Sequence, residues 1–369
     1  MKDLDKYRGC LIGGAAGDAL GYAIEFLDEH TIFSRYGKSG ITEYSLVNGV
    51  AEISDDTQMT LFTATGLLLG KTRGKMRGIR GKYLGYINSS YTDWYKTQTE
   101  SYPLQDEYNY SWLVNLPEMF SRRAPGNTCL SALNERHGTT DNPINQSKGC
   151  GGVMRVAPIG LYFDGSRQSI FEIDMIGAGA AALTHGHPLG YIPAAALVHI
   201  INLVAHNDNI LLLYAVEDMK KAIANQFSKN KYLQDFLQLI EKAIAFSKED
   251  ISDIDSIRKL GEGWVAEETL AIAIYCSLKY SDDFDKALIA SVNHNGDSDS
   301  TGAVTGNILG AHLGLKGIPQ KYLDKLEFKD IILEIADDLY NDCKISEYGS
   351  YRDDIWMQKY IFNSYSPKK

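Results

Sequence analysis

Apolar residues recur at helical spacing along most of this chain, and this periodicity restricts its fold more than any other feature. Spacing of three to four residues places apolar side chains on one face of a helix. No series of alternating segments indicates strands. The sequence therefore predicts an all-α, multi-helix bundle. The helical stretches are Met59 to Leu69, the run that Pro188 begins, Asp235 to Phe246, Glu267 to Leu278 and Ser300 to Leu313.

Nothing in the chain marks a boundary between domains. Its 369 residues contain no internal repeat and no low-complexity linker. A polar stretch of Gly and Asn residues, Ala124 to Gly152, has apolar helices on both sides, so we interpret it as a functional loop. We expect one domain over residues 1–369. Ser300 to Leu313 is rich in Gly and Ala, which predicts close packing of that helix.

Composition and charge exclude several classes of protein. The 37 basic and 47 acidic residues give a net charge of −10, which argues against nucleic acid as a partner. The five cysteines form no Cys-x-x-Cys pair, so neither a disulfide scaffold nor a cysteine zinc site is expected. The longest apolar candidate, Ile176 to Leu183, is too short to span a membrane. With no apolar signal region at the N-terminus, we expect a cytoplasmic protein, and we favour a monomer.

Basic residues gather between positions 71 and 82, with glycines among them. We interpret this segment first as a solvated loop, and second as a surface that faces an anion or a partner. Its members are Lys71, Arg73, Lys75, Arg77, Arg80 and Lys82.

Two short segments combine carboxylates with hydroxyl groups, each at the start of an expected helix. The first is Ser54-Asp55-Asp56-Thr57 and the second is Asp297-Ser298-Asp299-Ser300-Thr301. Aspartate at a helix start caps backbone N–H groups, which explains one aspartate in each segment. Adjacent carboxylates repel each other, and hard cations such as Mg²⁺ prefer oxygen ligands. Spacing alone leaves both interpretations open.

Glycine-rich segments supply further candidates. Gly13 to Gly21 precedes Glu25, and its small residues either pack helices closely or admit a ligand to the backbone. Gly149 to Arg155 is either a flexible turn or a loop whose N–H groups bind phosphate beside a charged arginine. His185 and His187 precede a helix that starts with proline; without a third His or Cys nearby, such a pair is more typical of structural or ligand-contacting residues than of metal ligands.

Taken in order, these segments resemble the ADP-ribosylglycohydrolase family. The similarity covers roughly residues 8 to 315, and six short motifs in the same order are far more specific than any one of them. The resemblance implies an all-α fold with a binuclear Mg²⁺ or Mn²⁺ site. The matching motifs are Gly9 to Gly21 with Glu25-Phe26, Ser54 to Thr57, Gly126-Asn127-Thr128, Gly149 to Gly160, Thr184-His185 and Asp297 to Gly302.

The resemblance also implies roles for individual residues. Two metal ions are expected on oxygen ligands from both acidic segments, and a water molecule attacks C1″ of ADP-ribose after losing its proton to Glu25, Asp56 or Asp299. The glycine loop is expected to hold the diphosphate, and His185 to line the same site. The implied metal ligands are Ser54, Asp55, Asp56, Asp297, Asp299 and Ser300. The implied ligand-binding residues are Gly149, Gly151, Gly152, Val153, Met154, Arg155 and His185.

The expected activity is metal-dependent hydrolysis of the bond between ADP-ribose and a protein side chain or small molecule. Two departures from the family bear on it. Cys150 replaces an asparagine found in many members, and Arg122-Arg123-Ala124-Pro125 replaces the acidic residue that precedes Gly-Asn-Thr in arginine-specific bacterial members. The acceptor therefore stays open. The alternatives are a non-catalytic ADP-ribose-binding module, an Asp-x-Asp-x-Thr phosphatase based on Asp297 to Thr301, and a partner-binding bundle that uses Lys71 to Lys82.

Overall fold

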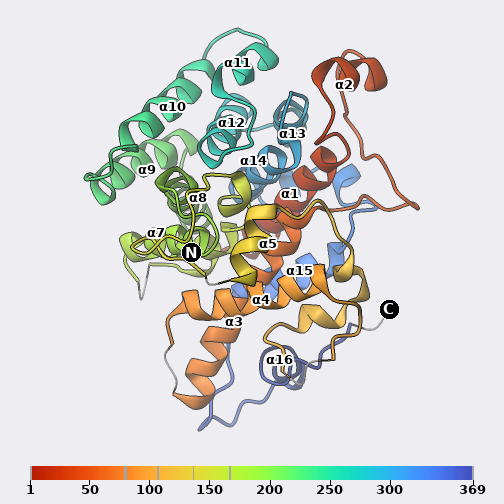
Figure 1. Ribbon diagram of the computed structural model, residues 1–369, viewed down its shortest axis with the longest axis vertical. Coiled ribbons are helices and arrows are strands. Elements are labelled where there is room, and N and C mark those ends of the chain that lie inside the picture. Colours follow the sequence, from red (N-terminus) through yellow and green to blue (C-terminus); the bar gives the residue numbers. More distant parts are fainter. Residues whose placement is uncertain (1, 79–80, 106–107, 136, 166–167, 368–369) are drawn as a thin grey trace.

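The chain folds into a bundle of helices (Figure 1). The computed structural model describes residues 2–78, 81–105, 108–135, 137–165 and 168–367. Within these ranges the only β-type pairings are isolated bridges, so the all-α prediction is confirmed. The α-helices are α1 Leu4–Tyr22, α2 Glu29–Tyr36, α3 Asp55–Arg77, α4 Tyr83–Thr99, α5 Asn127–Asn134, α6 Ala157–Tyr162, α7 Ile170–Ala182, α8 Pro188–His206, α9 Leu212–Gln226, α10 Leu233–Phe246, α11 Asp253–Leu260, α12 Ala266–Lys279, α13 Phe284–Val292, α14 Ser298–Leu313, α15 Lys329–Asn341 and α16 Asp354–Tyr360. The short 3₁₀ helices are η1 Trp112–Asn115, η2 Pro117–Phe120, η3 Cys150–Gly152, η4 Leu315–Gly317 and η5 Gln320–Tyr322.

The centre of the bundle is a close crossing of α1 and α14, which pack together more extensively than any other pair of described helices. Glycines face each other along this contact at steps of four residues. A Cβ atom on Gly306 would lie 1.9 Å from the carbonyl oxygen of Gly13, and one on Gly17 would lie 2.0 Å from that of Gly302. The backbones therefore touch directly, and the close packing expected for Ser300 to Leu313 is confirmed. The same pattern continues at Gly9 with Gly310 and at Gly21 with Ser298.

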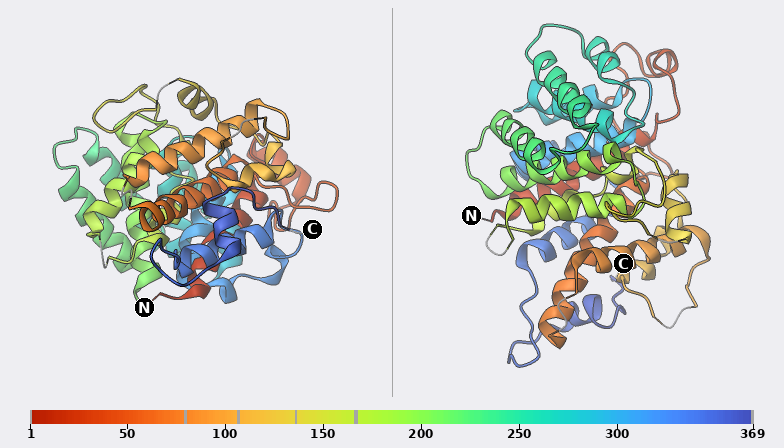
Figure 2. Two further views of the ribbon diagram at one scale, coloured as in Figure 1. Left: turned by 90° about the horizontal axis from the view of Figure 1, so that it is seen from below. Right: turned by 60° about the vertical axis from the view of Figure 1, so that its left-hand side comes forward.

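The remaining helices surround this crossing along the long axis of the molecule. Helices α9 to α11 lie toward one end, and α16 with the C-terminal part of α3 lies toward the other (Figures 1 and 2). Buried side chains from α1 through α16 join one hydrophobic cluster. The first and last thirds of the chain thus share a core, which is why residues distant in sequence meet near its centre.

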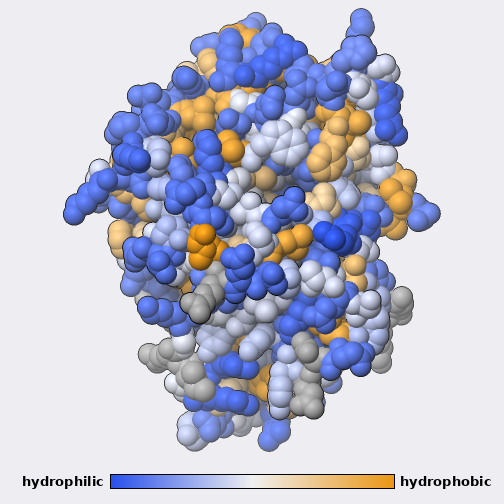
Figure 3. All heavy atoms as spheres, viewed as in Figure 1, coloured by the Kyte–Doolittle hydropathy of each residue, from blue (hydrophilic) through white to orange (hydrophobic). Residues whose placement is uncertain are grey.

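Helix α8 corrects one expectation about apolar segments. Pro188–His206 contains no Asp, Glu, Lys or Arg and is long and apolar enough to cross a membrane, so Ile176 to Leu183 is not the longest candidate. However, 89% of the qualifying stretch is buried inside the fold. Such burial is the behaviour of a core helix. On the face shown in Figure 3, hydrophobic side chains are scattered among hydrophilic ones.

The prediction of a solvated loop at positions 71 to 82 is wrong for the first half of that segment, which is helical. Lys71, Arg73, Lys75 and Arg77 belong to the last turns of α3, where basic side chains favour the helix dipole. The helix ends at Gly78, whose φ of 65° is the left-handed conformation typical of a C-cap. Lys71 pairs with Asp342 at 3.2 Å. Of the remaining residues in this segment, Arg80 lies outside the described ranges.

The polar stretch Ala124 to Gly152 also contains more helix than expected. Helix α5 occupies Asn127–Asn134 and η3 occupies Cys150–Gly152. Both of these short helices adjoin the acidic segments, through contacts described below.

We predict that Gly306→Ala destabilises the protein by about 2–3 kcal/mol, because the added methyl group forces α1 and α14 apart. The matched control is Gly85→Ala in α4, where an added Cβ meets no atom within 4 Å. That substitution is expected to be neutral or to stabilise by up to about 1 kcal/mol, since alanine favours a helix. Denaturant unfolding of the three proteins measures the difference, and equal stability of the two variants would contradict the role of the crossing.

Candidate active site

The buried carboxylate of Asp18 fixes the start of α3 against α1. Its Oδ1 accepts the backbone N–H of Ser54 at 2.9 Å, and its Oδ2 accepts that of Thr57 at 3.0 Å and the Thr57 hydroxyl. These bonds satisfy N–H groups that a helix start leaves without partners. Asp18 thereby performs much of the capping that sequence reasoning assigned to the aspartates of α3. Asp55 and Asp56 are left available for other contacts.

Helices α3 and α14 begin at the same place, so the two acidic segments meet there. Ser54 caps α3 through Asp56 N–H at 3.2 Å, and the side chain of Asp297 caps α14 through Ser300 N–H at 3.2 Å. The neighbouring Ser300 side chain partly offsets the rise in the pKa of Asp56, which places it beside that carboxylate. Asp55, Asp56, Asp297 and Asp299 are each at most 5% exposed. Four aspartates are thus concentrated in one buried volume.

Glu25 joins this cluster from the segment that follows α1. Burial and the neighbouring carboxylates of Asp297 and Asp55 raise the pKa of Glu25 to about 9. The same causes, burial first, raise the pKa of Asp55 to about 8 and raise those of Asp56 and Asp299 well above their usual range. Glu25 Oε2 and Asp56 Oδ2 are buried oxygens without a hydrogen-bond partner.

The cluster has the donor chemistry of a hard-cation site. Among the described residues, none of its five carboxylates forms an ion pair with Lys or Arg, and two of its buried oxygens are orphaned. Among the described residues, no group of three or more His, Cys, Asp or Glu side chains is already positioned to hold a metal ion. Gly126 N–H instead binds Asp55 Oδ2 at 3.2 Å, and Cys150 donates to Asp297 Oδ2 at 2.7 Å. The residues fit a divalent cation, which would neutralise their mutual repulsion.

The glycine loop lies beside the acidic cluster. The Cys150 thiol contacts Asp297, and the Cys150 N–H donates to the carbonyl oxygen of Trp264 at 3.2 Å. The Trp264 ring in turn stacks on Phe26, with ring centroids 6.3 Å apart, and both rings are exposed. Phe26 follows Glu25 directly. A flat aromatic surface therefore connects the glycine loop with the segment that carries Glu25.

The structure places Arg155 and His185 beneath the glycine loop. Arg155 is fully buried, and its guanidinium donates to Thr184 Oγ1 at 2.6 Å and to the carbonyl oxygen of Ala180 at 3.2 Å. It is therefore a buried neighbour of the loop, and it does not reach an exposed ligand surface. A Cβ on Gly151 would lie 2.9 Å from the His185 ring, so glycine allows the loop to pack on that ring.

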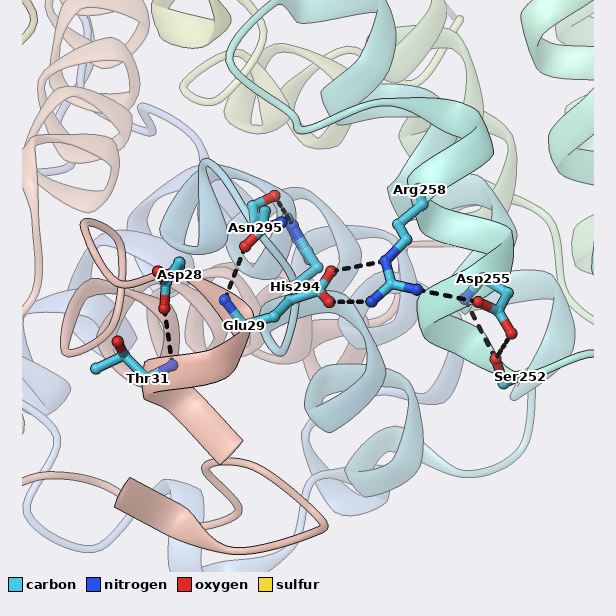
Figure 4. Close-up of polar contacts among 8 residues, drawn as sticks. All are labelled: Asp28, Glu29, Thr31, Ser252, Asp255, Arg258, His294 and Asn295. Atoms are coloured by element: carbon cyan, nitrogen blue, oxygen red, sulfur yellow. Dashed lines mark hydrogen bonds and ion pairs between the residues drawn. The ribbon is translucent and has the colours of Figure 1, made fainter. Parts of the chain in front are cut away.

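Ion pairs and amide groups hold the segment that follows Glu25 (Figure 4). Arg258 of α11 makes two contacts with the Glu29 carboxylate, one of them from Nε to Oε1 at 3.2 Å. Asn295 Oδ1 accepts the Glu29 N–H at 2.7 Å. Asn293 binds both backbone groups of Ile41 at 2.7 and 2.9 Å. The loop that leads to Asp297 thus also holds α2, which begins four residues after Glu25.

Comparison with known proteins agrees with this geometry. The family model described as ADP-ribosylglycohydrolase matches residues 1–348. The chain belongs to that family. The chain is 25% identical over 332 residues to the ADP-ribosyl-[dinitrogen reductase] glycohydrolase of Rhodospirillum rubrum, a match that covers 88% of this chain and 91% of the relative. It is 26% identical to the ADP-ribosylarginine hydrolase Tri1 of Serratia proteamaculans, over 92% of this chain and 80% of that protein.

A solved structure shares the fold of this glycohydrolase. A chain described as an ADP-ribosylglycohydrolase-related protein complex superposes with a TM-score of 0.51 and 20% identity, over 92% of this chain and 98% of its own length. Family and relatives together establish a hydrolase that acts on ADP-ribosyl compounds, as the sequence predicted. An Asp-x-Asp-x-Thr phosphatase is excluded, because Asp297 begins a helix within an all-α fold.

Sequence reasoning missed several residues that build the site. Asp18 was part of a recognised motif but received no role, although an aspartate inside a glycine-rich helix is itself a signal for a buried contact. The Glu29–Arg258 pair carries no local signal, because its members are 229 residues apart. Trp264 lies outside the six family motifs. The Gly261-Glu262-Gly263 sequence before it was the one local signal that the chain turns there.

We predict that the metal-free protein loses stability as pH rises from about 5.5 to 8.5. The folded protein keeps protons on Glu25 and Asp55 that the unfolded chain has released, so rising pH favours unfolding. Added Mg²⁺ should reduce the loss by favouring the ionised carboxylates. Melting temperatures across this range, in chelator and in Mg²⁺, measure the effect, and Asp55→Asn should flatten the slope in chelator. A melting temperature that rises with pH in chelator would contradict the assignment.

We predict that Arg258→Gln lowers turnover several-fold while changing stability by less than about 1 kcal/mol. Arg258 is half exposed, and such ion pairs contribute little to folding, but this pair restrains the segment that carries Glu25. The control is Asp255→Asn, which removes the other partner of Arg258 at 3.1 Å and leaves the Glu29 contact in place. Steady-state kinetics and melting temperatures should separate the two variants. Equal turnover in both would show that the pair has no role in positioning Glu25.

Proposed function

We propose that this glycohydrolase cleaves the N- or O-glycosidic bond between C1″ of ADP-ribose and an acceptor, with two divalent cations, Mg²⁺ or Mn²⁺, as cofactors. The observation that carries the proposal is the buried cluster of Glu25 with four aspartates, which has no basic partner among the described residues. A module that only binds ADP-ribose has no need of this concentration of charge. The family and the names of its relatives support the reaction class.

The cation ligands in this proposal are the oxygens of both acidic segments. Asp55, Asp56, Asp297 and Asp299 supply carboxylates, and Ser54 and Ser300 supply hydroxyls from the first turns of α3 and α14. When bound, such cations orient substrate oxygens and lower the pKa of water. Asp18 contributes indirectly, because its bonds to Ser54 and Thr57 fix the angle at which α3 presents Asp55 and Asp56.

Glu25 is the best candidate for the general base. It lies in the turn that follows α1, and its Oε2 has no hydrogen-bond partner among the described residues. A base must be ionised and free to receive a proton, and cation charge nearby would lower the raised pKa of Glu25 toward neutrality. Asp56 and Asp299 are alternative bases, since Asp56 Oδ2 is equally unpartnered.

The glycine loop and the aromatic pair are proposed to hold the remainder of the ligand. Gly149 is partly exposed, Gly151 packs on the His185 ring and Gly152 packs on Ala181. Val153 and Met154 complete the turn by donating their N–H groups to the Cys150 carbonyl oxygen. N–H groups in such a turn bind phosphate oxygens. The exposed rings of Phe26 and Trp264 offer a flat apolar surface to a planar group.

The acceptor is proposed from two opposing observations. Arg123 occupies the neighbourhood where arginine-specific members carry an acid, and it is paired with Glu52 and with Glu327, the latter at 3.2 Å. Both glutamates are already paired with Arg123, so a guanidinium acceptor would have to compete with it for them. The relative in Serratia is nevertheless named an ADP-ribosylarginine hydrolase. We propose an ADP-ribosylated protein or small ADP-ribosyl compound as substrate for a monomeric, cytoplasmic enzyme, with arginine as the acceptor to test against the others.

We predict that ADP-ribose is released only with Mg²⁺ or Mn²⁺, and that Glu25→Gln and Asp55→Asn each reduce turnover by at least about a hundredfold. The control is Asp330→Asn, which changes an exposed carboxylate in the first turn of α15 and should leave turnover unchanged. Release is measured from ADP-ribosyl-arginine, ADP-ribosyl-serine and O-acetyl-ADP-ribose, and binding of ADP-ribose by calorimetry. Binding without release from any substrate would favour the non-catalytic module.

A further inference from the structure

Arg155 presents a buried charge without an ion-pair partner in the part of the chain that the structure describes. Its side chain is fully buried, and among the described residues no carboxylate lies within ion-pair distance of its guanidinium. Within the same residues its Nε has no hydrogen-bond partner. Burying an unpaired cation is costly, so a protein that keeps one between core helices requires a compensating interaction.

The contacts of the guanidinium are neutral groups. Nη1 lies 3.2 Å from Met59 Sδ and 3.4 Å from Cys129 Sγ, both weak acceptors. The group also lies over the Tyr91 ring, with its central carbon 4.4 Å from the ring centroid. A cation–π contact and sulfur contacts stabilise the charge only in part.

A hydrogen-bond relay connects Arg155 with His185. Thr184 Oγ1 accepts from Arg155 Nη2 at 2.6 Å, so its own proton is free to donate, and His185 Nδ1 lies 2.8 Å away. The alternative acceptor, the carbonyl oxygen of Ala181, is more distant at 3.4 Å. With Nδ1 as acceptor, the proton of neutral His185 resides on Nε2. Burial and the Arg155 charge lower the pKa of His185 to about 3, so the ring is neutral.

The glycine loop covers both groups. Cβ atoms on Gly149 and Gly151 would lie 3.4 and 3.3 Å from His185 Nε2, and one on Gly151 would also lie 3.0 Å from Cys129 Sγ, which contacts Arg155. Cys129 thus connects the guanidinium with Gly151 of the loop. Coulomb interactions weaken slowly with distance where water is excluded, so a charge beneath the loop can act on an anion above it.

We propose that Arg155 is a positioning residue whose charge attracts the diphosphate of the ligand through the glycine loop and whose relay through Thr184 keeps the Nε2–H of His185 directed at that loop. The proposal rests on the proposed function, since it assumes an ADP-ribosyl ligand above the loop. In this proposal Arg155 strengthens ligand binding without touching the ligand, whereas the sequence predicted that Arg155 contacts the ligand directly. The anion that the protein lacks is supplied by the ligand.

The test compares a charged ligand with an uncharged one. ADP-ribose and adenosine are titrated into the wild type, Arg155→Lys and Arg155→Met, all in Mg²⁺. Loss of the charge should weaken ADP-ribose on the order of tenfold in Arg155→Met, and less in Arg155→Lys, while adenosine changes little. Lys359→Met is the matched control, because Lys359 is also buried but is paired with Asp338 and Glu334, and it should weaken neither ligand.

A second readout needs no substitution at Arg155. Nitrogen NMR of His185 in the wild type should show an unprotonated Nδ1 and a protonated Nε2, and Thr184→Val should remove this preference. Equal losses for ADP-ribose and adenosine in both Arg155 variants, or a protonated Nδ1 in the wild type, would overturn the proposal. If the wild type itself fails to bind ADP-ribose, the proposed function fails instead, which is a separate result.

Discussion

The direct contact between the backbones of α1 and α14 is the constraint on which the rest of the structure depends. Glycine at Gly13, Gly17, Gly302 and Gly306 allows the helix axes to approach until carbonyl oxygens meet α-carbons. This approach brings the end of α1, and with it Glu25, next to the first turn of α14, which carries Asp297 and Asp299. The hydrophobic core around the crossing stabilises the fold, but the crossing itself sets the geometry of the acidic cluster.

The site combines two opposite electrostatic problems a short distance apart. The cluster around Asp55 and Asp299 concentrates negative charge in a buried volume, which raises the pKa values of these carboxylates. Arg155, behind the glycine loop, is a buried positive charge without an ion-pair partner among the described residues. A cation on one side and an anionic ligand on the other would relieve both at once. The free energy that these unbalanced charges cost the folded protein would then be offset on binding, which would make the site selective for a charged ligand together with a metal.

Much of this arrangement could be predicted from sequence because its signals are local. The periodic apolar stretches predicted five helices, four of them close to their observed bounds, whereas α3 continues past Leu69 to Arg77. Ser54 and Asp297 were recognisable as residues that start helices. The contacts between distant segments had no such signal: the Glu29–Arg258 pair, the Asn293 contact with Ile41, and the capping of α3 by Asp18. Arg155 could be located beside the glycine loop, but sequence gives no sign of whether a side chain points outward or into the core. The basic segment was misread because glycines among its lysines resembled a loop, although the helix continues to Gly78.

The separation of α1 and α14 along the chain has a consequence for biosynthesis. Nearly 300 residues lie between Gly13 and Gly306, so α1 emerges from the ribosome long before its partner exists. Until the last part of the chain is synthesised, the glycine face of α1 and the aspartates of α3 have no structure to complete them, and intermediates of this size are prone to aggregation. A prematurely terminated chain that stops before Asp297 would therefore lack both the centre of the bundle and two carboxylates of the acidic cluster, those of Asp297 and Asp299. The enzyme therefore gains its fold and its complete acidic cluster in the same late step.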